Sequence, residues 1–268
     1  MSEKIESKQI KKDSGYAPVN GLKMYYEIYG EGEPLVLIHG GGSTIQTSFS
    51  KMIRLLAQHY KLIAVELQAH GHTNDRGTPE TFKQDADDVV ALLQYLKIGR
   101  ANILGFSNGG HTSMEIAIRH PEFVNKLVII SAFYQREGAI KGFFEGMDNA
   151  TLDNMPGPLK TSYLQINNDQ KGLQTMFERD KERMVQFKDW SDEEIRSIKA
   201  PAFLIAGDHD VVTPEHTVKM SKLIPNAELM ILPGTHGSFI GEICAAEPGS
   251  KMPEMTATII QEFLDKRK

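Results

Sequence analysis

The chain has 268 residues, 40% hydrophobic and 24% charged, which is ordinary for a soluble globular protein with a sizeable core. Its 30 Lys and Arg against 35 Asp and Glu give a net charge of −5. This charge argues against a nucleic-acid partner, because nucleic-acid-binding proteins usually carry a basic face. The single cysteine, Cys244, excludes an internal disulfide and a thiolate zinc cluster, and we expect it to be packed as a small hydrophobe.

The first residues, 1–15, are polar and charged, and they lack the apolar segment of a signal peptide. The sequence therefore predicts a frayed or disordered leader and a cytoplasmic protein, although a chain trimmed at a signal-peptide cleavage site would begin in the same way. No stretch approaches the roughly 20 consecutive apolar residues of a membrane span, so we expect no membrane partner.

A β-hairpin is predicted next. Its strands flank Asn20-Gly21, the strongest two-residue hairpin signal, and the second strand runs from Leu22 to Tyr29. The pattern then changes to short continuous apolar runs, which are typical of strands buried on both faces of a parallel sheet. These runs are Leu35–Ile38, Leu62–Val65, Ala101–Leu104, Leu127–Ile130, Ala202–Ile205 and Glu228–Leu232.

Helical patterns lie between and after these runs. Phe82–Leu96 has acidic residues in its early turns and an apolar stripe behind them. Asn108–His120 stops before a proline, and Met255–Leu264 repeats apolar residues at i, i+4 and i+8. Strands alternating with helices predict an α/β fold, with a mostly parallel, doubly wound sheet and an N-terminal antiparallel hairpin.

One interval, residues 134–199, contains no convincing strand. It carries many Met, Phe and Leu residues among charged ones, and a structureless loop of this length is improbable. We therefore expect a helical cap inserted between two core segments, residues 16–133 and 200–268. Its apolar residues either form a pocket or only pack the cap onto the core, and the sequence leaves both interpretations open.

Three glycines surround one serine where a predicted strand meets a predicted helix. Gly105-Phe-Ser107-Asn-Gly109 fits G-x-S-x-G in the required context, the nucleophile elbow. The residues two before and two after the serine nearly touch in such a turn, so only small residues fit at Gly105 and Gly109. The turn projects the Ser107 hydroxyl above the carboxyl ends of the strands, where α/β sheets bind ligands. For the motif alone, a chance glycine-rich turn is the alternative.

A glycine run, Gly40–Gly42, follows the first buried strand. Bare backbone at this position lets N–H groups approach a ligand, as an oxyanion hole requires. We expect the N–H of Gly41, with Gly42 in reserve, to act together with the N–H of Asn108 at the start of the following helix.

Two later predicted strands are followed by an acid and a histidine, the residue types that complete a catalytic triad with a serine. One leads to Asp210, the candidate for orienting a histidine, with Asp208 as a competitor more typical of a turn residue. The last strand leads to His236. The chain order Ser107, Asp210, His236, each at a strand end, predicts a catalytic triad.

With these motifs the chain resembles the cofactor-free serine esterases, lactonases and haloperoxidase-like hydrolases of the α/β-hydrolase fold, from about Tyr16 onward. The resemblance implies the α/β-hydrolase fold, the cap at residues 134–199 and no cofactor. One departure concerns a turn that often reads Asp-x-x-Gly-x-Gly-x-Ser in the family. Here it reads Glu-Leu-Gln-Ala-His-Gly-His-Thr over residues 66–73, which affects the local turn rather than the triad.

Other histidines are less informative. His70 and His72, followed by Asp75, lack the spacing of metallohydrolase ligand runs, so we predict no metal and a loop near the mouth of the active site. His111 and His209 are expected to be structural.

These residues predict a hydrolase that cleaves a carboxylic ester or lactone of a small, largely apolar substrate through an acyl-enzyme. Serine at position 107 argues against haloalkane dehalogenases and epoxide hydrolases, which resemble this fold but use aspartate at the elbow. Two alternatives stay open: a carbon–carbon bond hydrolase with the same triad, and a non-catalytic ligand-binding protein on this fold. The sequence carries no signal for an oligomeric state.

Overall fold

Eight strands form one sheet in the computed structural model, which describes residues 12–266. The strands are β1 (Lys12–Val19), β2 (Leu22–Tyr29), β3 (Glu33–Ile38), β4 (Tyr60–Val65), β5 (Ala101–Phe106), β6 (Val124–Ile130), β7 (Ala202–His209) and β8 (Ala227–Thr235). Their order across the sheet is β1-β2-β4-β3-β5-β6-β7-β8. Strands β3 to β8 run parallel, whereas the hairpin β1-β2 adds antiparallel at one edge. The predicted fold class is confirmed.

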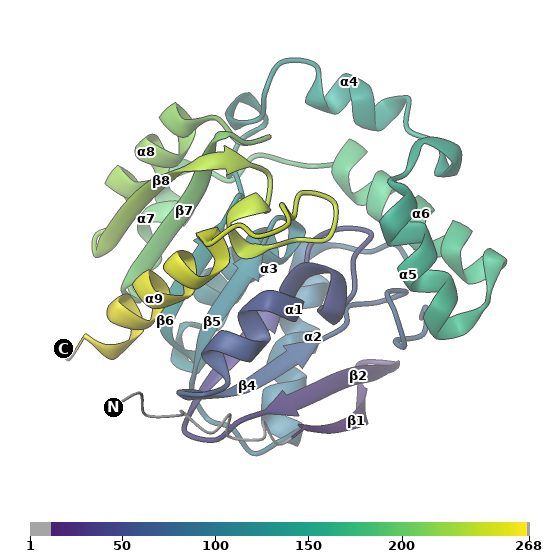
Figure 1. The fold of residues 1–268 in the computed structure, drawn as a ribbon, viewed down its shortest axis with the longest axis horizontal. Helices are drawn as coiled ribbons and strands as arrows, with labels where there is room; N and C mark the ends of the chain where they lie inside the picture. Colours follow the sequence, from purple (N-terminus) through teal and green to yellow (C-terminus); the bar gives the residue numbers. More distant parts are fainter. Residues whose placement is uncertain (1–11, 267–268) are drawn as a thin grey trace.

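Helices cover both faces of this sheet (Figure 1). One face packs against α1 (Ile45–Leu56) and α9 (Met252–Asp265), and the other against α2 (Phe82–Tyr95), α3 (Asn108–Arg119) and α8 (Pro214–Leu223). In β3, Leu35 and Leu37 belong to the first core, whereas Val36 and Ile38 belong to the second. Because both faces are buried, this strand reads as a continuous apolar run rather than an alternating one.

The segment 134–199, predicted to be a helical insertion, contains no strand and four α-helices in the structure. These are α4 (Phe143–Asp148), α5 (Gly157–Asn167), α6 (Gln170–Val185) and α7 (Asp192–Arg196). Figure 1 shows α4, α5 and α6 standing away from the sheet, and α7 beside α8. Short 3₁₀ turns connect elements at Pro121–Phe123, Arg136–Gly138, Leu152–Asn154 and Ser238–Ile240.

Two expectations differ from the structure. Strand β1 begins at Lys12, so it includes residues 12–15 of the expected leader, while residues 1–11 lie outside the described residues. The strand extends this far because Lys12 opposes Tyr29 in the β1-β2 ladder and its Nζ lies 2.8 Å from Glu27. Cys244 is exposed rather than packed, because it lies in the loop between the last 3₁₀ turn and α9, where no sheet or helix covers it.

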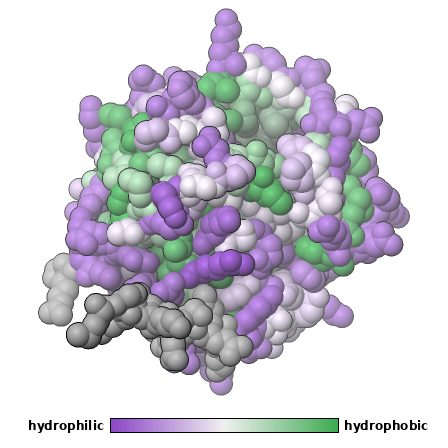
Figure 2. Space-filling model, viewed as in Figure 1, coloured by the Kyte–Doolittle hydropathy of each residue, from purple (hydrophilic) through white to green (hydrophobic). Residues whose placement is uncertain are grey.

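The face of the molecule in Figure 2 is mostly hydrophilic, with apolar patches between the polar side chains. Among residues 12–266, no helix combines the length and the apolarity that crossing a membrane requires.

Candidate active site

Ser107 occupies a sharp turn between β5 and α3. Its backbone has φ 55° and ψ −120°, a positive-φ conformation that residues other than glycine rarely adopt. The turn is held from below, since the Ser107 N–H donates to the carbonyl of Ile130 at 2.8 Å. A Cβ on Gly105 would lie 2.0 Å from the carbonyl oxygen of Gly109, so the two glycines are in the close contact that the motif predicts.

The side chains of Ser107, His236 and Asp210 form one hydrogen-bonded series. The Ser107 Oγ lies 3.0 Å from His236 Nε2, and His236 Nδ1 lies 2.6 Å from Asp210 Oδ1. They meet because β5, β7 and β8 are parallel and end at the same edge of the sheet. Phe106 packs against the imidazole, with the ring centroids 4.8 Å apart.

Asp210 is buried and fully hydrogen-bonded. Besides His236 it accepts from the hydroxyl of Ser131 and from the N–H groups of Gly207, at 3.1 Å, and Val211, at 2.7 Å. Burial alone would favour the neutral acid, but the hydrogen bond and charge of His236 outweigh it and hold the pKa of Asp210 below its ordinary value. Asp208 instead accepts from the Gly234 N–H at 2.8 Å, the behaviour of a turn residue.

The glycine loop after β3 lies against the elbow. A Cβ on Gly41 would lie 2.5 Å from the Asn108 Nδ2, so these two residues are neighbours. Within residues 12–266 the Gly41 N–H has no acceptor, whereas the Gly42 N–H donates to Asp180. The Asn108 N–H belongs to the first turn of α3, where no intrahelical acceptor exists.

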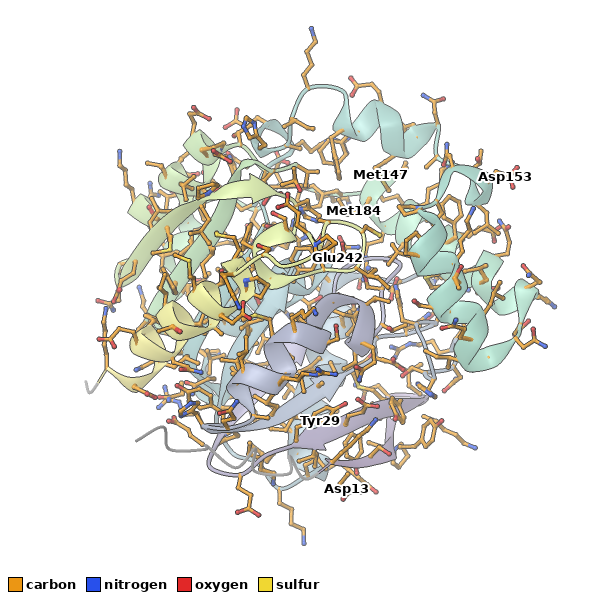
Figure 3. All side chains as sticks on the ribbon, viewed as in Figure 1. Asp13, Tyr29, Met147, Asp153, Met184 and Glu242 are labelled. Atoms are coloured by element: carbon orange, nitrogen blue, oxygen red, sulfur yellow. The ribbon has the colours of Figure 1, made fainter. Side chains whose placement is uncertain are left out.

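A cavity of about 320 Å³ opens above Ser107. Its wall includes Gly41, Gly42 and Asn108, and the part formed by the segment 134–199 is mainly apolar, with Phe143, Met147, Met155, Leu159, Phe177 and Met184. Figure 3 shows Met147 and Met184 on the side of this segment that faces the sheet. Apolar residues of the segment therefore line a pocket, and several of them, including Met155 and Leu159, also pack against other residues of the segment.

The histidines of the 66–73 turn serve two different carboxylates. The buried ring of His70 has Nδ1 2.7 Å from the carbonyl of Gln68 and Nε2 2.9 Å from Asp180. Burial favours a neutral ring, but the charge and hydrogen bond of Asp180 raise the pKa of His70 to about 9. His72 instead lies 2.9 Å from Glu66, which also accepts the His72 N–H and so closes the turn.

The two histidines expected to be structural lie in different settings. His111 is buried within 4.8–5.9 Å, between ring centroids, of Phe82, Phe133, Phe187 and Trp190, and burial lowers its pKa to about 3. His209 ends β7 and is exposed.

Two residues of this site, Ser131 and Asp180, could not be predicted from the sequence motifs. Ser131 follows β6 with a φ of 55°, and a strained serine after a buried strand has no recognisable motif. Asp180 gives a weak signal, because it interrupts the apolar stripe of α6 that contains Met176 and Met184.

Comparisons with known proteins agree with this architecture. A family model described as alpha/beta hydrolase fold matches residues 33–185. "Serine hydrolase BPHL" of Homo sapiens is 28% identical over 244 residues, which cover 83% of this chain and 80% of that protein. The 2-hydroxy-6-oxo-6-(2'-aminophenyl)hexa-2,4-dienoic acid hydrolase of Metapseudomonas resinovorans is 30% identical over 138 residues, 49% of this chain and 46% of that protein.

Two solved structures share the fold over nearly the whole chain. A serine hydrolase involved in carbazole degradation superposes with a TM-score of 0.78 at 23% identity, covering 96% of this chain and 100% of its own. The enol-lactonase of Burkholderia xenovorans superposes with a TM-score of 0.71 at 24% identity, covering 94% and 100%. At these identities the likeness bears on the fold alone.

Proposed function

The chain belongs to the alpha/beta hydrolase fold family, and we propose that it is a serine hydrolase that cleaves a carboxylic ester or lactone of a small, largely apolar substrate. The observation that carries the proposal is the series from Ser107 through His236 to Asp210, with Ser107 opening into an apolar cavity. A serine hydroxyl is a weak nucleophile until a neighbouring base takes its proton, and this geometry supplies that base.

In this mechanism Ser107 Oγ attacks the substrate carbonyl carbon while His236 Nε2 takes the hydroxyl proton. Asp210 keeps the Nδ1–H tautomer and stabilises the imidazolium that forms. His236 then protonates the leaving alcohol oxygen, which releases it and leaves an acyl ester on Ser107. In the second half His236 takes a proton from water, the hydroxide attacks the acyl carbon, and Ser107 recovers its proton as the acid leaves.

The oxyanion of each tetrahedral intermediate would accept hydrogen bonds from the N–H groups of Gly41 and Asn108. The unused Gly41 N–H and the position of Asn108 at the helix start support this assignment, and the Gly42 N–H is already given to Asp180. Each such donor typically contributes about 2.7–4 kcal/mol to transition-state stabilisation.

The apolar wall of the pocket favours a neutral substrate. The wall holds one cation, Lys181, whose Nζ donates to the carbonyl of Ala150 at 2.8 Å, and one anion, Asp180. Asp180 is itself paired with His70 and Arg183, so the pocket offers mainly apolar side chains to the substrate. The volume of about 320 Å³ lies at the lower end of small-molecule sites, so we expect short acyl chains to be preferred.

The test is hydrolysis of p-nitrophenyl esters from acetate to octanoate by the wild type, Ser107→Ala and Ser113→Ala. Ser113 is the matched control, because it lies on the same helix, is buried and donates its hydroxyl to the carbonyl of Gly110 at 2.7 Å. Turnover by the wild type and Ser113→Ala, but not by Ser107→Ala, is the expected result. Equal turnover by Ser107→Ala would refute the proposal.

A second candidate is a carbon–carbon bond hydrolase, because the M. resinovorans relative is named for a hexadienoic acid substrate. Labelling of Ser107 by a fluorophosphonate probe, together with no hydrolysis of any of the p-nitrophenyl esters, would favour this candidate. A 2-hydroxy-6-oxo-hexa-2,4-dienoic acid of the kind named for this relative would then be the substrate to test, and loss of its absorbance on addition of the protein would establish carbon–carbon bond hydrolysis. Failure of the probe to label folded wild-type protein would favour a non-catalytic binding role instead.

A further inference from the structure

One carboxylate of the cap contacts both segments that carry the candidate oxyanion donors. Asp180, on α6, accepts on Oδ2 from the N–H of Gly42 and from His70 Nε2 at 2.9 Å. On Oδ1 it accepts from Asn108 Nδ2 at 3.2 Å and from the guanidinium of Arg183. Gly42 adjoins Gly41, and Asn108 is itself a candidate donor, so Asp180 joins the two halves of the hole.

The carboxylate is held in place by two cations. His70 has an acceptor at each ring nitrogen, Gln68 on one side and Asp180 on the other, which is the arrangement of a doubly protonated imidazolium. Its Nε2 also lies 3.2 Å from the Gly42 nitrogen, but a protonated Nε2 has no lone pair to accept, so the Gly42 N–H is left to Asp180.

Arg183 is anchored in turn by Asp85, at 2.5 Å, and lies 3.5 Å from Glu80. Burial opposes ionisation of Asp180, but the His70 and Arg183 charges outweigh it and hold the pKa of Asp180 well below its usual range. Asp180 is therefore an anion whose charge is balanced locally, so it does not oppose the negative charge that develops on a substrate oxygen nearby.

The glycine loop is held by different partners along its length. Gly40 donates its N–H to Ser48 Oγ at 3.3 Å, and its carbonyl accepts from His39 Nδ1 at 2.7 Å. Gly42, with a φ of +64°, is held from the cap, since its N–H donates to Asp180 and a Cβ there would lie 2.8 Å from the methyl carbon of Met155. The Gly41 N–H lies in the same peptide plane as the Gly40 carbonyl, so His39 fixes it on one side and Asp180 anchors the following peptide on the other.

We propose that Asp180 is a positioning residue for the oxyanion hole, an inference that rests on the proposed function. Its four acceptor positions are all taken by protein donors, so it acts through Gly42 and Asn108 rather than on the substrate. The hole is then complete only while α6 of the cap is docked on the core.

The test compares Asp180→Asn with Glu178→Gln, a matched control that removes a carboxylate from the exposed side of the same helix. The measured quantity is the second-order rate of Ser107 phosphonylation by a fluorophosphonate, whose P=O oxygen uses the oxyanion hole and whose reaction needs no knowledge of the substrate. We expect a fall of about 10²-fold for Asp180→Asn, the typical loss when catalytic groups move by about 1 Å, and no change for Glu178→Gln.

Turnover of the best ester separates positioning from a general structural role. Asp180→Asn should lower kcat by a similar factor with little change in KM, because the lost interaction exists only in the transition state. Circular dichroism and melting temperature show whether the variant is folded. Phosphonylation of folded Asp180→Asn at the wild-type rate would overturn the inference and leave the proposed function intact.

A second variant decides the matter if Asp180→Asn does not fold. Asn108→Ala removes the side-chain bond to Asp180 but keeps the backbone N–H, so it should slow phosphonylation by about 10-fold while Gly42 stays anchored. An unchanged rate in folded Asn108→Ala would overturn the inference. If the wild type is not labelled at all, the proposed function fails first and this inference fails with it.

Discussion

Gly109→Ala tests the elbow without touching any reacting group. A Cβ on Gly109 would lie 2.0 Å from the carbonyl oxygen of Ile38 and 2.6 Å from that of His39. Ordinary contacts begin at 3.4 Å, so the Cβ would be about 1.4 Å too close to a backbone oxygen, and both partners are backbone atoms. The start of α3 must therefore move away from the end of β3.

This displacement separates the two candidate oxyanion donors. Ile38 and His39 are followed by Gly40 and then Gly41, whereas Gly109 directly follows Asn108. A misplacement of about 1 Å typically lowers the rate about 10²-fold, so kcat should fall by at least about that factor. Overpacking should also lower the free energy of unfolding by about 1–3 kcal/mol, which shifts the melting temperature by about 2–4 °C for each kcal/mol.

The assay measures ester turnover and thermal unfolding of Gly109→Ala beside Gly99→Ala. Gly99 is the matched control, because a Cβ there meets nothing within 4 Å. Gly99→Ala should retain both activity and melting temperature. If Gly109→Ala also kept wild-type turnover and melting temperature, the close contact between α3 and β3 would not be what shapes this site.

Three further outcomes are expected. Ser107→Gly should abolish turnover yet unfold at the same or a higher temperature, because glycine relieves a backbone strain of about 1–3 kcal/mol; a lower melting temperature would contradict this. Asp210→Asn should lower kcat about 10⁴-fold through the wrong His236 tautomer, and a loss below tenfold would argue against the orienting role. The melting temperature should fall as the pH rises from 6.5 to 9. In the folded protein the pKa of His70 is raised to about 9 and that of Glu80 to about 8, so both groups keep protons that the unfolded chain releases at lower pH. A flat or rising profile would contradict this, and His70→Gln should show a weaker fall.

Local patterns made much of this protein predictable. Each candidate site element can be recognised from a few adjacent residues at the end of a strand. These elements are the elbow at 105–109, the glycine run at 40–42, Asp210 and His236. Parallel strands bring such ends to one edge of the sheet, so positions far apart in the chain could be expected to meet. The buried runs likewise predicted the sheet, since a strand covered on both faces tolerates no alternation.

What could not be predicted depends on contacts between distant segments. Asp180 reaches Gly42 across 138 positions, and Ser131 reaches Asp210 across 79. No spacing rule links such pairs, because the first depends on how α6 lies against the glycine loop and the second on the loops that follow the neighbouring strands β6 and β7. The signal in α6 was indirect: Asp180 and Arg183 share the buried side of the helix with Leu173, Met176 and Met184, where unpaired charges would be unfavourable. A cluster of charges on an apolar stripe indicates partners elsewhere, without naming them.

The edge position of β8 bears on how this enzyme would lose its activity when warmed. Within residues 12–266, strand β8 pairs only with β7 and is partly exposed along its length, whereas β5 lies between β3 and β6 and is buried throughout. Local opening concentrates where few buried contacts hold a segment. His236 follows this edge strand and Ser107 follows the central one. Inactivation should therefore start with fraying of β8 and displacement of His236, the proposed base, below the global melting temperature. It should reverse on cooling, because Ser107, the proposed nucleophile, stays in place.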